Sequence, residues 1–269
     1  MSFSGSWALI LQAATLGATN HGIDAPMTTP RHTPTFADDF SGRTVDRAKW
    51  RFDVSRNKTG WPNNELQYYR PRDAAVRDGH VVLEARRETP RRAADWGGQR
   101  YTSVKLVTRR ALGFGFYEVR AKLPCGRGIW PAIWMLPATG QWPDEGEIDI
   151  MEMVGFDPNV IHATLHTGAF NHRLGTQRGA QTRVATACTE FHRYQLDWRP
   201  HAITIGVDDR AYFRVRDDQP GGKAAWPFTR PYQLILNVAV GGDWGGKQGV
   251  DDTRFPQAMA VDYVRYWAR

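Results

Sequence analysis

The sequence contains no apolar run near the ~20 residues that a membrane-spanning helix requires. It has only two cysteines, Cys125 and Cys188, which excludes a small scaffold held together by several disulfides. One bridge and two free thiols are both compatible with the sequence. No five-residue run of Lys and Arg occurs, although the formal net charge is +7. Positive charge spread in this way indicates a basic surface rather than a nucleic-acid-binding protein.

Long segments with helical hydrophobic periodicity are also missing. From Phe36 onward the chain shows short apolar or alternating runs separated by turn residues, which is typical of a β-sandwich or barrel. With 269 residues and 41% hydrophobic content the chain can bury one full core, so no internal domain boundary is required. The clearest predicted strands are residues 81–85, 103–108, 116–123, 161–166, 202–207, 232–238 and 261–267.

The N-terminal segment differs in character from the rest of the chain. Residues 7–18 form a short apolar run, and a segment containing Gly, Thr and Pro follows through Pro34 without periodicity. This order resembles the apolar region of a signal peptide followed by a linker, although no Lys or Arg precedes it. We expect residues 1–33 to be a signal peptide or a disordered leader, and residues 34–269 to form the folded domain.

Three carboxylates interrupt an otherwise apolar run at residues 147–153, which reads Glu-Ile-Asp-Ile-Met-Glu-Met. Side chains alternate along a strand, so Glu147 and Asp149 share one face and Glu152 points to the other. One extra residue at a β-bulge, most simply Met151, returns Glu152 to the face of the other two, and bulges are common beside active sites. Glu147 and Glu152 are then four strand positions apart, with Cα atoms roughly 13 Å from each other.

The two outer acids of this row, Glu147 and Glu152, are suited to be the catalytic carboxyl pair of a glycosidase. Side chains that lean inward can reach the ~5–5.5 Å carboxyl separation of retaining enzymes, whereas inverting enzymes leave ~6.5–9.5 Å for a water. The alternative interpretation is a strand with a solvated acidic face. Because neighbouring acids repel one another, a purely structural strand gains by placing Lys or Arg among them. The pattern therefore favours a nucleophile, a helper group and an acid/base.

Aromatic residues are abundant, and several of the eleven Trp residues stand beside Gly and Pro in polar segments. Trp130 and Trp134 fall on one face of the predicted strand 128–137, whose opposite parity is already apolar. We therefore expect the Trp face to be partly open and to stack on sugar rings, with the Asn-Asn-Glu segment 63–65 binding hydroxyls. The alternatives are a core stripe for the Trp residues and a polar turn for residues 63–65.

The histidines and the glycine-rich segment indicate no metal or phosphate chemistry. His162 and His166 resemble a helical metal pair, but their surroundings are strand-like and no third ligand stands at motif spacing. A histidine beside the acid row is suited to hydrogen bonding with a carboxylate or a sugar hydroxyl. Segment 241–246 lacks the Lys and the strand-to-helix context of a phosphate-binding loop. Its Trp244 is instead predicted to line one end of a cleft.

Together these motifs resemble glycoside hydrolase family 16, specifically its bacterial laminarinase-like group of endo-β-1,3-glucanases. The active strand of that group reads Glu-x-Asp-x-x-Glu with the bulge residue present, as in residues 147–152. The resemblance covers nearly everything after residue 34 in the family's order. It runs through residues 36–39, 63–69, 128–137, 146–152, 191–198, 236–244 and 261–266.

The resemblance implies a β-jelly-roll sandwich of two curved antiparallel sheets, with an open substrate cleft on the concave face. It also implies that Glu147 is the nucleophile and Glu152 the general acid/base, while Asp149 lies between them and hydrogen-bonds the nucleophile. A negative neighbour raises the pKa of the acid and keeps it protonated until the leaving oxygen takes the proton. The substrate-binding positions that the resemblance implies are Asn64, Trp130, Trp134, Trp142, His166 and Trp244.

The resemblance further implies a structural calcium bound by Asp39, the Gly79 carbonyl and Asp262, with no cofactor needed for catalysis. Asp39 stands where the family more often has Glu, and Lys105 replaces a common Arg. The implied activity is retaining hydrolysis of internal β-1,3-glucosidic bonds in laminarin-type β-glucan. Two alternatives remain: a mixed-linkage β-1,3-1,4-glucanase, and a non-catalytic β-glucan-binding protein of the same fold.

The intact acid row argues against a pure binding protein, which has no need of clustered acids. We further expect a β-glucan polysaccharide as the partner, with neither nucleic acid nor a membrane span, a monomeric chain, and a secreted or periplasmic location.

Overall fold

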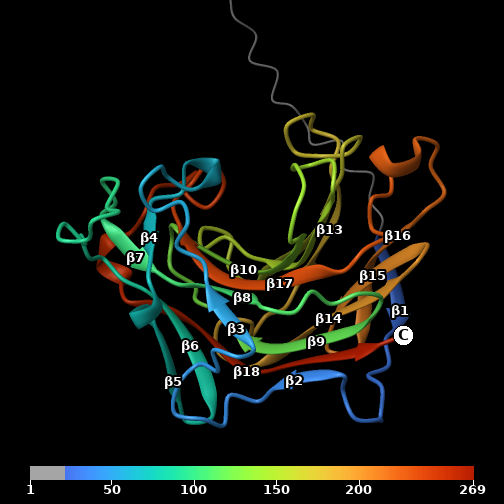
Figure 1. Cartoon of the computed structure of the whole chain (residues 1–269), viewed down its shortest axis with the longest axis horizontal. Coiled ribbons are helices and arrows are strands. Elements are labelled where there is room, and N and C mark those ends of the chain that lie inside the picture. Colours follow the sequence, from blue (N-terminus) through green and yellow to red (C-terminus); the bar gives the residue numbers. More distant parts are fainter. Residues whose placement is uncertain (1–21) are drawn as a thin grey trace, which may run out of the picture.

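The computed structural model describes residues 22–269, which form two curved antiparallel sheets packed face to face (Figure 1). The predicted all-β sandwich is therefore confirmed. Short 3-10 turns are the only helical elements of this range: η1 (Pro62–Asn64), η2 (Pro71–Asp73), η3 (Gly222–Ala224) and η4 (Asp252–Arg254). None of them is long and apolar enough to cross a membrane.

The inner sheet forms the concave face of the sandwich, and loops rise on both sides of it (Figure 1). Its seven strands are, in spatial order, β13 (Arg178–Arg183), β12 (Val160–His166), β11 (Glu147–Glu152), β10 (Ile129–Pro137), β17 (Tyr232–Val240), β8 (Lys105–Thr108) and β3 (Trp50–Phe52).

The outer sheet forms the convex face and has nine strands. In spatial order these are β1 (Gly22–Pro26), β16 (Arg210–Arg216), β15 (Ala202–Val207), β14 (His192–Arg199), β9 (Gly115–Lys122), β18 (Gln257–Ala268), β6 (His80–Ala85) and β5 (Ala74–Arg77), with β2 (Phe36–Asp38) also paired to β18. A separate parallel pair, β4 (Gln67–Tyr69) and β7 (Tyr101–Ser103), lies at one side of the concave face.

Alternate side chains of the strands point inward and fill the space between the two sheets, as the sequence predicts. Every second residue from Tyr117 to Leu123 is at most 2% exposed, and Ile161, Ala163 and Leu165 of β12 are at most 1% exposed. The other parity of β12 is left for the concave face. The core therefore fixes which side chains of the inner sheet can meet a ligand.

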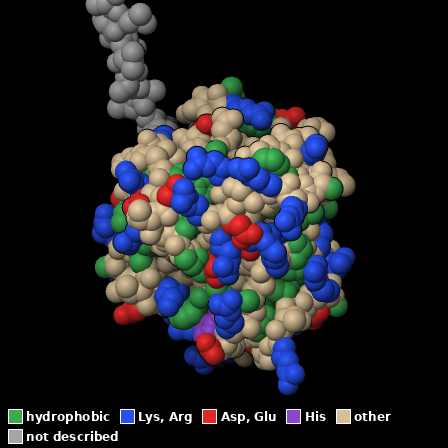
Figure 2. All heavy atoms as spheres, turned by 90° about the vertical axis from the view of Figure 1, so that its left-hand side faces the viewer, with side chains coloured by type: hydrophobic (Ala, Val, Ile, Leu, Met, Phe, Trp, Pro, Cys, Tyr) green, Lys and Arg blue, Asp and Glu red, His purple; other side chains and the backbone are tan. Residues whose placement is uncertain are grey.

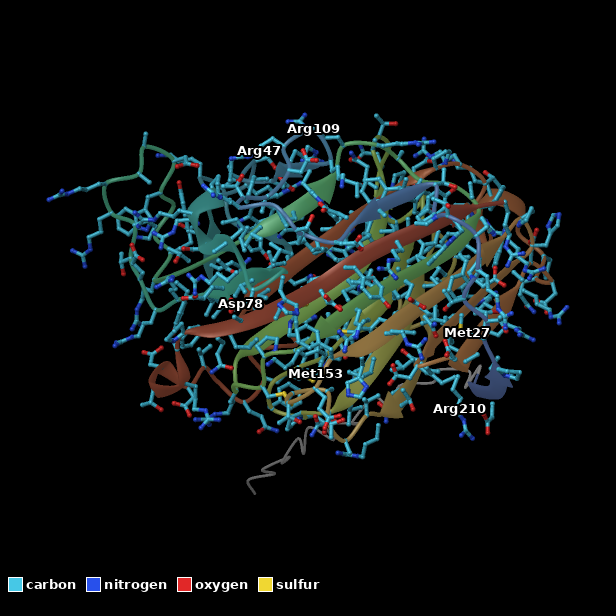
Figure 3. The ribbon with its side chains drawn as sticks, turned by 90° about the horizontal axis from the view of Figure 1, so that it is seen from below. Met27, Arg47, Asp78, Arg109, Met153 and Arg210 are labelled. Carbon is cyan, nitrogen blue, oxygen red and sulfur yellow. A yellow bond between two sulfur atoms is a disulfide. The ribbon has the colours of Figure 1, made fainter. Side chains whose placement is uncertain are left out.

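The folded domain begins before residue 34, which corrects the predicted boundary. β1 pairs with β16, and Met27 is buried with Phe116 and Trp267 in a small cluster. The hydroxyl of Thr29 also donates a hydrogen bond to the Glu118 carboxylate. This segment therefore covers part of the outward face of β9, at the corner where Figure 3 labels Met27 and Arg210. The rest of the predicted leader, residues 1–21, lies outside the described residues.

The predicted strand 103–108 is divided at Val104. β7 ends at Ser103 and pairs in parallel with β4, whereas β8 begins at Lys105 and joins β17 in the inner sheet. The Ser103 hydroxyl donates a hydrogen bond of 2.6 Å to the Val238 carbonyl. This bond fixes the point at which the chain passes from one sheet to the other, a change that residue alternation cannot reveal.

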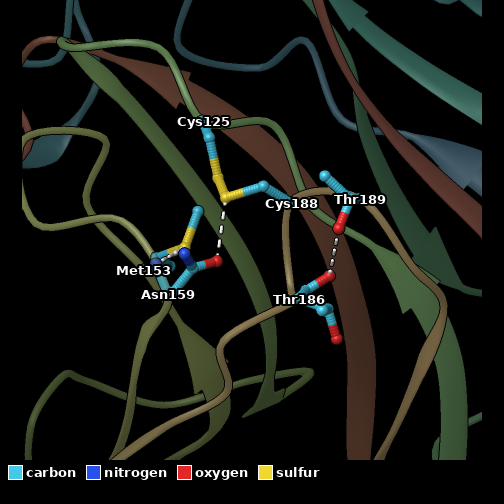
Figure 4. Close-up of a disulfide and its surroundings, with 6 residues drawn as sticks. All are labelled: Cys125, Met153, Asn159, Thr186, Cys188 and Thr189. Carbon is cyan, nitrogen blue, oxygen red and sulfur yellow. Dashed lines mark hydrogen bonds between the residues drawn. A yellow bond between two sulfur atoms is a disulfide. The ribbon is translucent and has the colours of Figure 1, made fainter.

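The two cysteines are joined in a disulfide, which decides between the two possibilities that the sequence leaves open. The bridge lies beside the segment that follows β11, as Figure 4 shows. Asn159 Oδ1 lies 3.1 Å from Cys188 Sγ, and the Asn159 backbone N–H donates a hydrogen bond to the Met153 sulfur at 3.3 Å. The disulfide therefore supports the end of the strand that carries the acid row.

Charges on the surface beside β4 to β7 are interspersed rather than gathered in one block. Figure 2 shows Lys and Arg over this face with Asp and Glu among them. Several arginines are paired there, including Arg72 with Glu88 at 2.6 Å and Arg87 with Asp252 at 2.9 Å. The distribution agrees with a basic surface of mixed charge rather than a polyanion groove.

Candidate active site

The predicted bulge is present in β11, but it spans two residues. Toward β10, Met151 pairs with Ile133, and Asp149 pairs with the next residue of β10, Trp134. Ile150 has no residue opposite it on β10 and is therefore the extra residue of the bulge on this side. On the side of β12, Asp149 pairs with Thr164 and Glu152 with His162, and the ladder is irregular between these pairs. The extra residue toward β10 is therefore Ile150 rather than Met151, which corrects the prediction by one position.

The bulge works because both of its side chains enter the core. Ile150 is 1% exposed and Met151 is fully buried, so two successive residues point inward. Glu152 is consequently returned to the face of Glu147 and Asp149. The paired residues of β12 on this face are His166 opposite Glu147 and His162 opposite Glu152.

Each outer glutamate of the row receives a hydrogen bond from a tryptophan. Trp142 Nε1 donates to Glu147 Oε2, and Trp130 Nε1 donates to Glu152 Oε1, each at 2.9 Å. Asp149 lies between the two glutamates in sequence and is 2% exposed. The indole N–H groups fix the orientation of one oxygen on each glutamate and leave the second oxygen available for other contacts.

Burial raises the pKa of all three carboxyl groups. It raises the pKa of Glu147 to about 7, although hydrogen bonds from Trp142 and Asp149 oppose the shift. It raises the pKa of Glu152 to about 8, with a further contribution from the Glu147 charge. The pKa of Asp149 lies well above its usual range because of burial and the charges on both glutamates. At neutral pH the row therefore holds a proton donor at Glu152 and ionises most readily at Glu147.

Aromatic rings flank the row at both ends. Near Glu152, the Trp244 ring lies edge-on to Trp130 at 5.3 Å and to His162 at 4.9 Å between centroids. Near Glu147, the Trp142 ring lies 5.9 Å from the His166 ring. Flat apolar rings beside carboxyl groups suit a ligand with both apolar faces and hydroxyls, such as a sugar chain.

The remaining predicted binding residues lie in the same region. Asn64 Nδ2 donates a hydrogen bond of 2.8 Å to Asp243 Oδ1, which links its turn to the glycine-rich segment before Trp244. Trp134 lies on the concave face with its Nε1 bonded to Asn237 Oδ1 at 2.7 Å. All six predicted substrate-binding residues are thus positioned around the inner sheet and its adjoining loops.

The structure adds charged residues to this face that the sequence motifs do not identify as site residues. Lys105 Nζ lies 4.9 Å from the Trp61 ring centroid and 5.1 Å from that of Trp134, and it pairs with Asp53 at 3.2 Å. From a loop, Arg173 lies over the Trp142 ring at 4.5 Å. These contacts join residues far apart in sequence, so no local pattern could identify them. The replacement of a common Arg by Lys105 was the single available signal.

Both carboxylates predicted to bind calcium are paired with arginines. The Asp39 carboxylate pairs with Arg265 at 3.1 Å, and the Asp262 carboxylate pairs with Arg120 at 2.5 Å. His80 Nε2 also lies 3.7 Å from Asp262. Calcium requires six to eight oxygen ligands, whereas here both carboxylates are bound to guanidinium groups. The calcium site therefore stays a prediction.

We predict that Glu152→Gln stabilises the protein at high pH. A carboxyl group whose folded pKa is raised stabilises the fold fully below its ordinary pKa of 4.5, and this stability is lost as the pH rises through about 8. Because Glu152 keeps some contact with solvent, we expect a gain on the order of 1 kcal/mol above pH 8, or about 2–4 °C in Tm, and none near pH 4. Thermal unfolding at both pH values measures the difference.

The control for this measurement is Glu190→Gln, which neutralises an exposed glutamate. It should change Tm by the same small amount at both pH values. A Glu152→Gln variant that gains no stability above pH 8 relative to pH 4 would show that Glu152 does not carry a destabilising charge in the folded protein.

The sequence model described as "Glycosyl hydrolases family 16" matches residues 63–265. The beta-glucanase of Rhodothermus marinus is 46% identical over 272 residues, which cover 96% of this chain and 92% of that protein. The X-ray structure of the laminarinase from Rhodothermus marinus has a TM-score of 0.82 at 47% identity and covers 90% of this chain and 99% of its own. The crystal structure of a non-specific endo-β-1,3(4)-glucanase has a TM-score of 0.90 at 49% identity, covering 95% and 98%.

Proposed function

Because this chain belongs to glycosyl hydrolase family 16, we propose that it is a retaining endo-glycosidase that hydrolyses internal β-1,3-glucosidic bonds of laminarin-type β-glucan. The observation that carries the proposal is the bulge in β11, which places Glu147, Asp149 and Glu152 on one concave face. Relatives named laminarinase and beta-glucanase support the substrate class.

The chemistry assigned to the row is a double displacement. Glu152 gives its proton to the glycosidic oxygen as Glu147 attacks the anomeric carbon, so the leaving sugar departs and a glycosyl-enzyme ester forms. Glu152 then takes a proton from water, which attacks the same carbon and releases Glu147. The Trp142 N–H orients the Glu147 carboxylate during attack. The two glutamates supply the nucleophile and every proton transfer, so the reaction requires no cofactor.

Asp149 acts on the nucleophile rather than on the substrate. A hydrogen bond from Asp149 lowers the pKa of Glu147, although burial raises it overall, and burial together with the Glu147 charge keeps Asp149 protonated. Asp149 can therefore donate this bond and favour the ionised nucleophile. This role agrees with its position between the two glutamates.

A second candidate function is cleavage of mixed-linkage β-1,3-1,4-glucan. It is favoured by the likeness to a structure whose name describes a non-specific endo-β-1,3(4)-glucanase. The three carboxyl groups do not distinguish the two linkages, because a β-1,3 and a β-1,4 bond both join an anomeric carbon to a leaving oxygen. The loops around the aromatic residues decide which bond lies at the row.

A secreted or periplasmic location and a monomeric state complete the proposal. The Cys125–Cys188 disulfide supports an oxidising compartment, because cytosolic thiols are normally kept reduced. A polysaccharide is also reached most directly outside the cytoplasm. The concave face is built by a single chain, so no second copy is needed to complete the acid row.

We expect laminarin hydrolysis to release oligosaccharides of several lengths, with the β-anomer formed first and glycosyl transfer to added acceptors. The measurement is a product profile on laminarin, lichenan, agarose and carrageenan, combined with NMR spectra of the earliest product. Binding without hydrolysis would identify a β-glucan-binding protein, and cleavage of lichenan but not laminarin would favour the mixed-linkage activity. Early α-anomer would contradict the double displacement.

A further inference from the structure

One group of side chains on the concave face has the composition of a metal site. Glu147, Asp149 and His166 offer ligand atoms that all lie within 4.8 Å of one another, and no other group of three His, Cys, Asp or Glu residues in the described range 22–269 does so. His166 Nε2 is 3.4 Å from Asp149 Oδ2 and 3.9 Å from Glu147 Oε1. Two carboxyl groups and one imidazole thus converge on one point.

A second observation indicates that this point is prepared for a ligand. Asp149 is 2% exposed, yet its Oδ2 atom forms no hydrogen bond within the described part of the chain. This oxygen points toward His166, which is itself 7% exposed. A buried carboxyl oxygen without a partner is costly, and a cation that displaces the Asp149 proton satisfies it.

We propose that this site binds one divalent transition-metal ion of the Zn²⁺ class through Glu147, Asp149 and His166. Ligand atoms at ~2.0–2.2 Å from tetrahedral Zn²⁺ are about 3.4 Å apart, which matches the His166–Asp149 distance and requires a small closure at Glu147. Three protein ligands leave a fourth position, which lies on the concave face. Calcium and magnesium prefer oxygen ligands alone, so the imidazole selects against them.

The metal acts as an inhibitor, and this part rests on the proposed function. A bound ion holds the Glu147 carboxylate, so the group can no longer attack an anomeric carbon. Because Trp142 Nε1 already binds Oε2 of Glu147, the ion takes the remaining oxygen, Oε1, beside the point that the anomeric carbon must approach. Inhibition therefore competes with the substrate and is reversed by a chelator. A thiol cannot account for it, because both cysteines of the chain are in the disulfide.

The test uses zinc chloride as the probe and isothermal titration calorimetry of the whole protein as the readout. We expect one Zn²⁺ per chain in this site, a rise in Tm with zinc, and at least a tenfold weaker Kd in both His166→Gln and Glu147→Gln. The control is His201→Gln, which removes an exposed histidine paired with Asp217 at 3.0 Å and should leave the titration unchanged.

Circular dichroism identifies any variant that fails to fold, and two variants at separate ligands prevent the result from depending on one of them. Equal zinc affinity in wild type and both variants would overturn the site, as would a loss of binding in His201→Gln alone. If the protein binds zinc but hydrolyses no glucan, the metal site is supported and the proposed function is contradicted. Hydrolysis that is insensitive to zinc in a protein that binds no zinc would overturn the site alone.

Discussion

Glu152→Ala is expected to lose laminarin hydrolysis by about 10²–10⁴-fold, the usual contribution of a general acid, while keeping part of its activity on an activated aryl β-glucoside. An aryl leaving group needs little protonation, so the remaining nucleophile Glu147 can still form the glycosyl-enzyme. Azide should then accelerate turnover and yield a β-glycosyl azide, because azide attacks the intermediate without needing a general base. Steady-state rates with and without azide, and NMR of the azide product, measure both effects.

Glu147→Ala is the matched variant, since it removes the other glutamate and leaves the acid in place. It should lose activity on laminarin and on the aryl glycoside alike, because no covalent intermediate can form. If azide instead rescues Glu147→Ala with an α-azide product and fails to rescue Glu152→Ala, the roles of the two glutamates are reversed. The tryptophan partners differ between them, so the two variants also probe two separate indole contacts.

Alternation in the sequence predicts the core of this fold and the face of the site well, because both depend on local strand geometry. The parity of β12 assigns Ile161 to the core and His166 to the concave face, and the structure confirms both. The two Trp residues of β10 and the acids of β11 also lie where alternation and a bulge place them. The prediction that Met151 is the extra residue of the bulge was wrong toward β10, where the extra residue is Ile150. Both residues are apolar, so the alternation of apolar and acidic residues cannot distinguish them.

Long-range pairings set the limit of sequence reasoning. The sequence cannot indicate that Lys105 approaches two tryptophans, because Trp61 and Trp134 belong to other elements. The arginine partners of Asp39 and Asp262 were not predicted for a related reason: two carboxylates in the sequence give no information on the arginines that reach them from neighbouring strands. The start of the domain was also missed, since the pairing of β1 with β16 joins residues 184 to 191 positions apart.

Deleting Met151 is expected to reduce activity as far as Glu152→Ala does. The bulge places two residues where regular pairing allows one, so removal of either Ile150 or Met151 restores simple alternation. Glu152 is then turned away from Glu147 and toward the core. Stability should fall as well, because the Glu152 carboxylate is moved into apolar surroundings. Met153, which is fully buried in the wild-type protein, would also turn to the opposite face of the sheet. Rates on laminarin and thermal midpoints measure the two losses.

Met151→Leu is the control for the Met151 deletion, because it keeps the number of residues and replaces one fully buried apolar side chain by another of similar volume. Most of the activity should remain, with a stability cost below ~1.5 kcal/mol. Deleting Ile150 provides a second test, since the structure identifies it as the residue left over toward β10. If either deletion variant stays folded and active, Glu152 does not depend on the bulge for its position. Loss of activity in both deletions and its retention in Met151→Leu would show that the number of residues in the strand, rather than the methionine itself, places the acid.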